Sequence, residues 1–221
     1  MKKLSDISEW KQAINMIIHG NCLDGMKLIP DKAIDLILTD PPYGIGENSH
    51  RVASRGKLAR TKDYGFFDWD KKISEAFFQE MIRISKNQII FGGNYYANWL
   101  APSSCWIVWD KNNSGSFADC ELAWTSFKTA VRKIKYTWNG MMQEDMKNKE
   151  IRLHPTQKPT EVMRWILANY SKETDLICDP FMGSWTTARA CKDMGRDFIG
   201  FELDENYCKI GKKRLEQGNL F

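Results

Sequence analysis

Short apolar runs alternate with helical patterns along most of the chain, and this alternation constrains the fold more than any other feature of the sequence. Runs this short and this apolar predict strands that are buried on both faces, as in a parallel sheet covered by helices. The predicted strands are 15–19, 35–39, 88–92, 105–109, 121–126, 175–178 and 197–201. We therefore expect an α/β fold with a doubly wound, mostly parallel sheet of seven strands and helices on both faces, in the Rossmann-like manner.

Four helices are predicted between or after these strands. Apolar residues recur at helical spacing in 74–84 and in 160–170. A third helix is expected over 186–194, with Gly195 just beyond it as a C-cap, and a fourth over 205–216.

The chain has 221 residues, which is the upper range of one domain, so we expect a single domain over 1–221. Two stretches interrupt the strand and helix pattern, at 44–67 and at about 128–153, and long irregular segments in a compact domain usually have a use. The first stretch carries five basic residues against two acidic ones. These basic residues are Arg51, Arg55, Lys57, Arg60 and Lys62.

Composition excludes several classes of protein. The net charge of +4 is too small to establish a polyanionic partner by itself. No apolar stretch approaches the roughly 18 residues that cross a bilayer, and the basic amino terminus is followed by no apolar run, so we expect a cytoplasmic protein without a signal peptide. The six cysteines include no CxxC pair and have no histidine at ligand spacing, so no metal site is expected.

The tetrapeptide Asp40-Pro41-Pro42-Tyr43 directly follows the strand predicted at 35–39. Open α/β sheets bind their ligands beyond the carboxyl ends of such strands. Two successive prolines form a rigid turn that presents carbonyl oxygens beside a carboxylate and an aromatic ring. This combination suits a planar group with an NH2, because Asp40 and a proline carbonyl can each accept one N–H while the ring stacks on Tyr43. For these four residues alone, a proline turn that only closes the strand is the alternative interpretation.

A second motif, Asp179-Pro180-Phe181-Met182-Gly183-Ser184, leads from the strand predicted at 175–178 into a helix. A glycine allows close approach to the backbone and the start of a helix presents free N–H groups, which is typical of sites for adenosine cofactors. Glu202 follows Asp179 by 23 residues, at the end of the next strand, where an acidic residue binds ribose hydroxyls in nucleotide-binding folds. No GxGxxG motif is present, which disfavours a dinucleotide.

Together with the segment His154-Pro155-Thr156-Gln157-Lys158-Pro159, these motifs resemble the beta group of amino DNA methyltransferases. In that family the catalytic motif precedes the S-adenosylmethionine motif, a circularly permuted order. The resemblance extends from about residue 15 to residue 214. It implies that Asp40, Pro41, Pro42 and Tyr43 are catalytic. It also implies that the S-adenosyl-L-methionine pocket is formed by Asn21, Cys22, Thr156, Lys158, Asp179, Phe181, Gly183, Ser184 and Glu202.

The resemblance further implies methyl transfer to the exocyclic amino group of a base in double-stranded DNA, with adenine N6 favoured by the Asp-Pro-Pro-Tyr form and cytosine N4 as the alternative. A base in a duplex must be flipped out for such chemistry. The five basic residues of 44–67 would then contact phosphates, and 128–153 is a second candidate DNA-recognition segment. The protein is expected to act as a monomer or homodimer. Methylation of protein glutamine or of RNA is a weaker option, because related glutamine enzymes begin the catalytic motif with Asn.

Two positions depart from the family pattern. Trp185 stands where the family commonly has a glycine, and a bulky residue does not readily adopt a positive φ. If its indole closed the cofactor pocket, the chain would be a catalytically weak DNA-binding protein; we expect the indole to pack into the helix–sheet core instead. Asn21 stands where Asp is frequent, and its amide oxygen can still accept a hydrogen bond.

Overall fold

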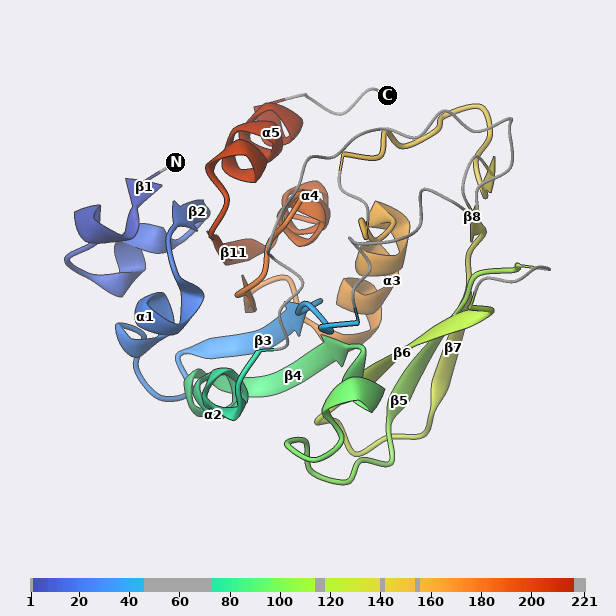
Figure 1. The fold of residues 1–221 in the computed structure, drawn as a ribbon, viewed down its shortest axis with the longest axis horizontal. Coiled ribbons are helices and arrows are strands. Elements are labelled where there is room, and N and C mark those ends of the chain that lie inside the picture. The colour runs from blue at the N-terminus through green and yellow to red at the C-terminus, as the bar shows by residue number, and fades with distance from the viewer. Residues whose placement is uncertain (1, 46–72, 114–117, 140–141, 154–155, 217–221) are drawn as a thin grey trace.

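The computed structural model describes residues 2–45, 73–113, 118–139, 142–153 and 156–216 (Figure 1). In this part of the chain a nine-stranded sheet has the order β1-β2-β11-β10-β3-β4-β6-β5-β7, and only β6 runs antiparallel to its neighbours. The strands of this sheet are β1 (Lys2–Lys3), β2 (Met16–His19), β3 (Ile34–Thr39), β4 (Ser85–Phe91), β5 (Trp106–Asp110), β6 (Cys120–Thr125), β7 (Arg132–Lys135), β10 (Leu176–Asp179) and β11 (Asp197–Glu202). A separate small pair is formed by β8 (Trp138–Asn139) and β9 (Met142–Gln143).

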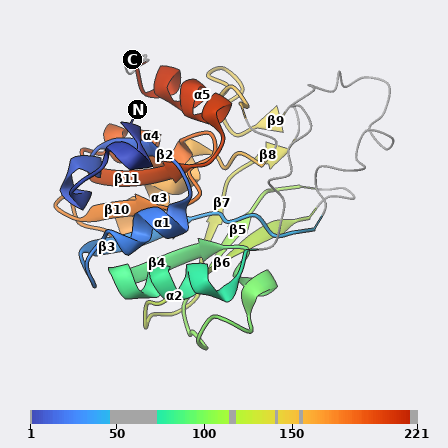
Figure 2. The same ribbon diagram turned by 60° about the vertical axis from the view of Figure 1, so that its left-hand side comes forward.

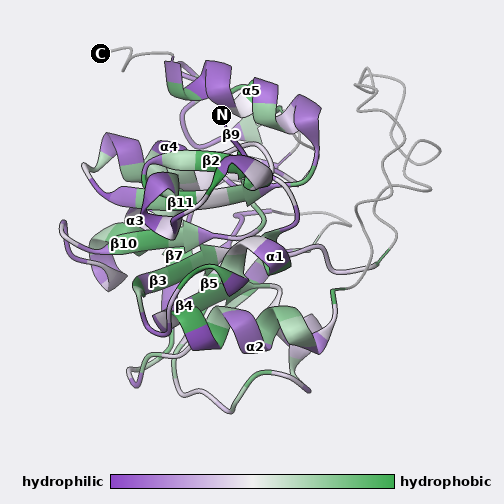
Figure 3. Cartoon of the chain, turned by 90° about the vertical axis from the view of Figure 1, so that its left-hand side faces the viewer, coloured by the Kyte–Doolittle hydropathy of each residue, from purple (hydrophilic) through white to green (hydrophobic). Residues whose placement is uncertain are grey.

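Helices cover both faces of the sheet. Their bounds are α1 (Cys22–Lys27), α2 (Glu75–Ile84), α3 (Thr160–Tyr170), α4 (Thr186–Asp193) and α5 (Glu205–Glu216). Apolar residues of α1 and α2 share one buried cluster with the sheet, and those of α3, α4 and α5 share the other. Figure 2 shows α2 beside β4 and α5 beside β2 and β11. Most of the residues in the middle of the sheet are hydrophobic, whereas the helices present hydrophilic residues outward (Figure 3). This pattern is expected of strands buried on both faces.

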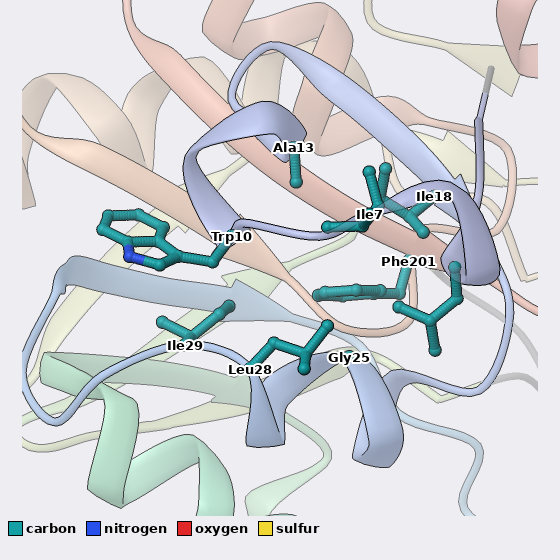
Figure 4. Close-up of a pocket in the computed structure, with 9 residues that line it drawn as sticks. Ile7, Trp10, Ala13, Ile18, Gly25, Leu28, Ile29 and Phe201 are labelled. Atoms are coloured by element: carbon teal, nitrogen blue, oxygen red, sulfur yellow. The ribbon is translucent and has the colours of Figure 1, made fainter.

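The amino-terminal segment packs over α1, the edge of the sheet and Phe201. Its apolar side chains line a gap of about 10 Å³, the size of one water molecule (Figure 4). Gly25 of α1 is essential to this packing, because a Cβ at that position would lie 2.1 Å from the ring of Phe201. The helix therefore approaches the sheet more closely than a larger residue would allow.

All seven predicted strands and all four predicted helices are present, with bounds that shift by up to three residues. The number of strands was wrong, because β1 and β7 extend the sheet at its two edges. β7 also lies within 128–153, which was expected to be irregular. Its sequence Arg-Lys-Ile-Lys buries only Ile134, and the charges that are typical of an edge strand conceal the apolar pattern.

The short helix α1, which was not predicted, begins after Asn21, whose side chain accepts a hydrogen bond from the backbone N–H of Leu23 at 2.9 Å. Among the described residues no helix is long and apolar enough to cross a bilayer.

Candidate active site

Three acidic residues predicted for the site lie at one edge of the sheet. Asp40 follows the last residue of β3, Asp179 ends β10, and Glu202 ends β11. The three strands are parallel neighbours, so their carboxyl ends meet at the same edge. The hydroxyl of Thr39 donates a hydrogen bond of 2.6 Å to Oδ1 of Asp179, which joins the first motif directly to the second.

Both oxygens of the Asp40 carboxylate have a partner. Tyr43 donates its hydroxyl to Oδ1 at 2.5 Å, and the Lys158 ammonium contacts Oδ2 at 2.5 Å. Burial raises the pKa of Asp40, although Lys158 opposes that rise. Each carboxylate oxygen has two lone pairs, so the two contacts orient the group and still leave acceptor sites for a substrate.

Lys158 also contacts Glu121, a residue of β6 that was not predicted as part of the site. Its Nζ lies 3.1 Å from Oε2 of Glu121, whose other oxygen pairs with Lys111. Burial alone would lower the pKa of Lys158, but the carboxylates of Asp40 and Glu121 outweigh it and raise this pKa. Lys158 was predicted to line the cofactor pocket; in the structure its ammonium contacts Asp40 and Glu121. A charged residue at the start of an otherwise apolar strand was the available signal for Glu121.

The ring of Tyr43 lies against the turn after β4. It stacks on Tyr95 with ring centroids 4.7 Å apart and an interplanar angle of 20°. Gly92 has a φ of 65°, and a Cβ there would lie 2.1 Å from the Tyr43 ring, so only glycine fits. The hydroxyl of Tyr96 donates to the carbonyl of Pro42. Tyr95 and Tyr96 were not predicted as site residues, and Tyr95 is 41% exposed beside Tyr43.

Asp179 is buried and has three hydrogen-bond donors. Besides Thr39, the hydroxyl of Thr187 donates to Oδ2 at 2.6 Å and the backbone N–H of Phe181 to Oδ1 at 3.0 Å. Burial raises the pKa of Asp179 to about 6, and these hydrogen bonds limit the rise. Asp179 therefore shapes the turn between β10 and α4 through its own hydrogen bonds.

Glu202 accepts hydrogen bonds from the backbone of the same turn and of the segment after β11. Gly183 donates its backbone N–H to Oε2 at 2.7 Å and Asp204 donates to Oε1 at 2.7 Å. Burial raises the pKa of Glu202 to about 7, against the effect of the two backbone donors. Gly183 has a φ of 52°, and the nearest atom to a Cβ built there is 4.0 Å away, so the backbone is open to a ligand beside this carboxylate.

The other predicted pocket residues lie around this edge in different settings. Asn21 caps α1, and Cys22 is buried as the first residue of that helix, where burial raises the pKa of its thiol to about 12. The rings of Phe181 and Phe77 are 5.6 Å apart. Ser184 is buried and Thr156 is partly exposed. The basic residues predicted to bind DNA, Arg51, Arg55, Lys57, Arg60 and Lys62, lie outside the described residues.

Trp185 points into the core, as expected. Its side chain is 3% exposed and belongs to the cluster under α3, α4 and α5. It nevertheless adopts a φ of 68°, the left-handed conformation in which a glycine would be unstrained. Gly211 of α5 makes room for the ring, because a Cβ there would lie 1.9 Å from an indole carbon. The indole therefore fills space between α4 and α5.

Comparisons with known proteins agree with this geometry. The model of the DNA methylase family of N6 and N4 enzymes matches residues 108–213. The chain is 28% identical to the type II methyltransferase M.HinfI of Haemophilus influenzae, over 92% of this chain and 69% of that protein. It is also 28% identical to the DNA adenine methyltransferase YhdJ of Escherichia coli K12, over 90% and 82%.

Solved structures show the same fold. The crystal structure of an M1.HpyAVI–SAM complex has a TM-score of 0.55 and 25% identity, and the match covers 90% of this chain and 98% of that one. The cytosine-N4-specific PvuII DNA methyltransferase has a TM-score of 0.63 at 17% identity, over 93% and 88%. With the acidic edge of the sheet and the Asp-Pro-Pro-Tyr turn in place, these matches make the chain similar to N6 and N4 DNA methylases over nine-tenths of its length, and they support its resemblance to the beta group of amino DNA methyltransferases.

Proposed function

We propose that the chain transfers a methyl group from S-adenosylmethionine to the N6 amino group of a flipped adenine in double-stranded DNA. The observation that carries the proposal is the position of Asp40 and Tyr43, directly beside the edge formed by Asp179 and Glu202. YhdJ, a relative over nine-tenths of this chain, is named as an adenine enzyme, which favours adenine over cytosine. Because the proposed substrate of this chain is DNA, we propose that the reaction takes place in the cytoplasm.

The residues at the edge of the sheet fit this cofactor. The Glu202 carboxylate can accept hydrogen bonds from two ribose hydroxyls, and the open backbone at Gly183 admits a ligand beside it. Phe181 offers an aromatic surface next to the same turn. When bound, S-adenosylmethionine would supply an electrophilic methyl group on its sulfonium.

The Asp-Pro-Pro-Tyr turn is built to receive an amino group. Asp40 would accept one N–H through an acceptor site that Tyr43 and Lys158 leave unused. The Pro42 carbonyl is bonded to Tyr96, whereas the Pro41 carbonyl has no hydrogen-bond partner among the described residues and would accept the second N–H. The base would stack on Tyr43. These contacts withdraw the nitrogen lone pair from the ring and orient it for in-line attack, so catalysis comes from positioning and polarisation.

A direct test is incubation of the purified protein with labelled cofactor and unmethylated genomic DNA, followed by nucleoside analysis and methylation-aware sequencing. The expected product is N6-methyladenine at one sequence. If the product is N4-methylcytosine, the methylated base is cytosine and not adenine. If the DNA remains unlabelled and calorimetry detects no binding at millimolar S-adenosylmethionine, a DNA-binding protein without activity is favoured.

The role of Asp40 is tested by Asp40→Ala. We expect turnover to fall at least about a hundredfold, the order seen when one positioned polar group is lost, with cofactor affinity nearly unchanged. Asp35→Ala is the matched control, because Asp35 lies on β3, the strand that Asp40 follows, and pairs with Lys86 at 2.6 Å, away from the Asp40 turn. Activity of Asp40→Ala within a few-fold of wild type would contradict the assigned role.

A further inference from the structure

Lys158 lies between two carboxylates that come from different parts of the sheet. Asp40 follows β3, Glu121 lies on β6, and Lys158 precedes α3, yet their side chains meet at 2.5 and 3.1 Å. The Lys158 side chain is 5% exposed, and its Nζ lies 5.2 Å from the centre of the Phe91 ring. An ammonium this deeply buried needs both charge compensation and hydrogen-bond acceptors.

The cluster is electrically balanced. Lys111, the residue after β5, pairs with the oxygen of Glu121 that does not face Lys158. Two ammonium groups and two carboxylates therefore form a continuous row from Lys111 through Glu121 and Lys158 to Asp40. Within this row Glu121 is the only described carboxylate besides Asp40 that pairs with Lys158.

We propose that Glu121 is a positioning residue, which holds Lys158 against Oδ2 of Asp40 and so keeps the Asp40 carboxylate oriented toward the amino group of the base. The proposal rests on the methyl transfer proposed above. Lysine is long and flexible, with three donors on a rotatable ammonium, so one carboxylate partner does not define its position. Glu121 supplies the second contact. Lys111 in turn orients Glu121 through its other oxygen.

The expected consequence is kinetic. If Lys158 leaves Oδ2, the carboxylate of Asp40 rotates and its acceptor site no longer meets the amino group. Misplacement of a reacting group by about 1 Å can reduce turnover about a hundredfold. We therefore expect Glu121→Leu to lower kcat at least about tenfold with little change in cofactor Kd. Glu121→Gln keeps an oxygen beside Lys158 but removes one negative charge, so kcat should fall clearly less than in Glu121→Leu.

A double-mutant cycle with Lys158→Met separates positioning from a general loss of structure. If Glu121 acts through Lys158, Glu121→Leu has no further effect on kcat once Lys158 is methionine. Asp193→Asn is the matched control. Asp193 is also a buried carboxylate between two cations, Arg164 and Arg189, but it lies at the end of α4. It should lose thermal stability while kcat stays within about twofold. Effects of Glu121→Leu and Lys158→Met that multiply would overturn the proposal, as would wild-type kcat in Glu121→Leu.

A second measurement does not depend on activity. In wild-type protein, the Lys158 ammonium should exchange its protons slowly enough to give a resolved 15N–1H signal that is lost in Glu121→Leu and retained in Glu121→Gln. An unchanged signal in Glu121→Leu would show that Lys158 stays in place without Glu121, which refutes positioning. Failure of the wild-type protein to methylate DNA, with this signal lost as expected, would refute only the proposed function.

Discussion

Replacement of Gly211 by alanine tests how Trp185 is packed. Alanine normally stabilises a helix relative to glycine, by about 1 kcal/mol. At position 211 the added Cβ would lie 1.9 Å from an indole carbon of Trp185, about half of an ordinary contact distance. The indole is buried, with an exposed fraction of 3%, and belongs to the core cluster under α3, α4 and α5, so it cannot move out into solvent without leaving that cluster. Overpacking of this kind costs about 1 to 3 kcal/mol or more, so we expect Gly211→Ala to destabilise the protein despite its better helix propensity.

The sign of the effect should reverse when the indole is absent. Trp185→Gly removes a buried ring, at about 3 to 5 kcal/mol, and relieves a left-handed backbone worth about 1 to 2 kcal/mol. We expect a net loss of about 1 to 4 kcal/mol with little change in cofactor affinity. In that background Gly211→Ala meets no ring and should stabilise the protein by about 1 kcal/mol.

Urea denaturation of the four proteins gives the free energies of unfolding, and calorimetry gives the cofactor Kd. The m-value shows whether the denatured state has changed. Stabilisation by Gly211→Ala in the presence of Trp185 would refute the packing argument. A large gain in cofactor affinity for Trp185→Gly, without loss of stability, would instead mean that the indole blocks the pocket.

Four further predictions concern Glu202, Gly92 and the basic residues of 44–67. Burial raises the pKa of Glu202 to about 7, and the ribose hydroxyls would bind its ionised form, so Glu202 would release a proton when the cofactor binds. Cofactor affinity should therefore rise between about pH 6 and pH 8, and calorimetry in two buffers can measure the proton release. Glu202→Gln should remove this pH dependence. The raised pKa also means that Glu202 favours folding below about pH 4.5, and that this contribution is lost as pH rises through about 7, which thermal melting of the free protein at several pH values can follow. Gly92→Ala should push the Tyr43 ring from its place and lower kcat at least about tenfold, without a matching change in cofactor Kd, in single-turnover assays. Alanine at all five basic positions of 44–67 should weaken DNA binding and reduce the slope of its salt dependence by about one unit per lost phosphate contact. Unchanged DNA binding would mean that the DNA surface lies elsewhere, for example around β7. The positions changed are Arg51, Arg55, Lys57, Arg60 and Lys62.

The sequence by itself determined the strands and the main helices, because both are encoded in local apolar periodicity. It also placed Asp40, Asp179 and Glu202 at strand ends, and parallel strands bring such ends to one edge of a sheet. The edge strands β1 and β7 and the six-residue helix α1 were missed, since each is too short to show a period against its charged residues.

Only the tertiary structure decided which side chains meet at that edge. Lys158 is 118 residues from Asp40 along the chain, and no local pattern predicts that it contacts both Asp40 and Glu121. The direction of the Trp185 indole also depended on α5, where Gly211 leaves the space that it fills. Such contacts depend on how close separate elements approach in the folded chain, and local periodicity carries no record of that distance.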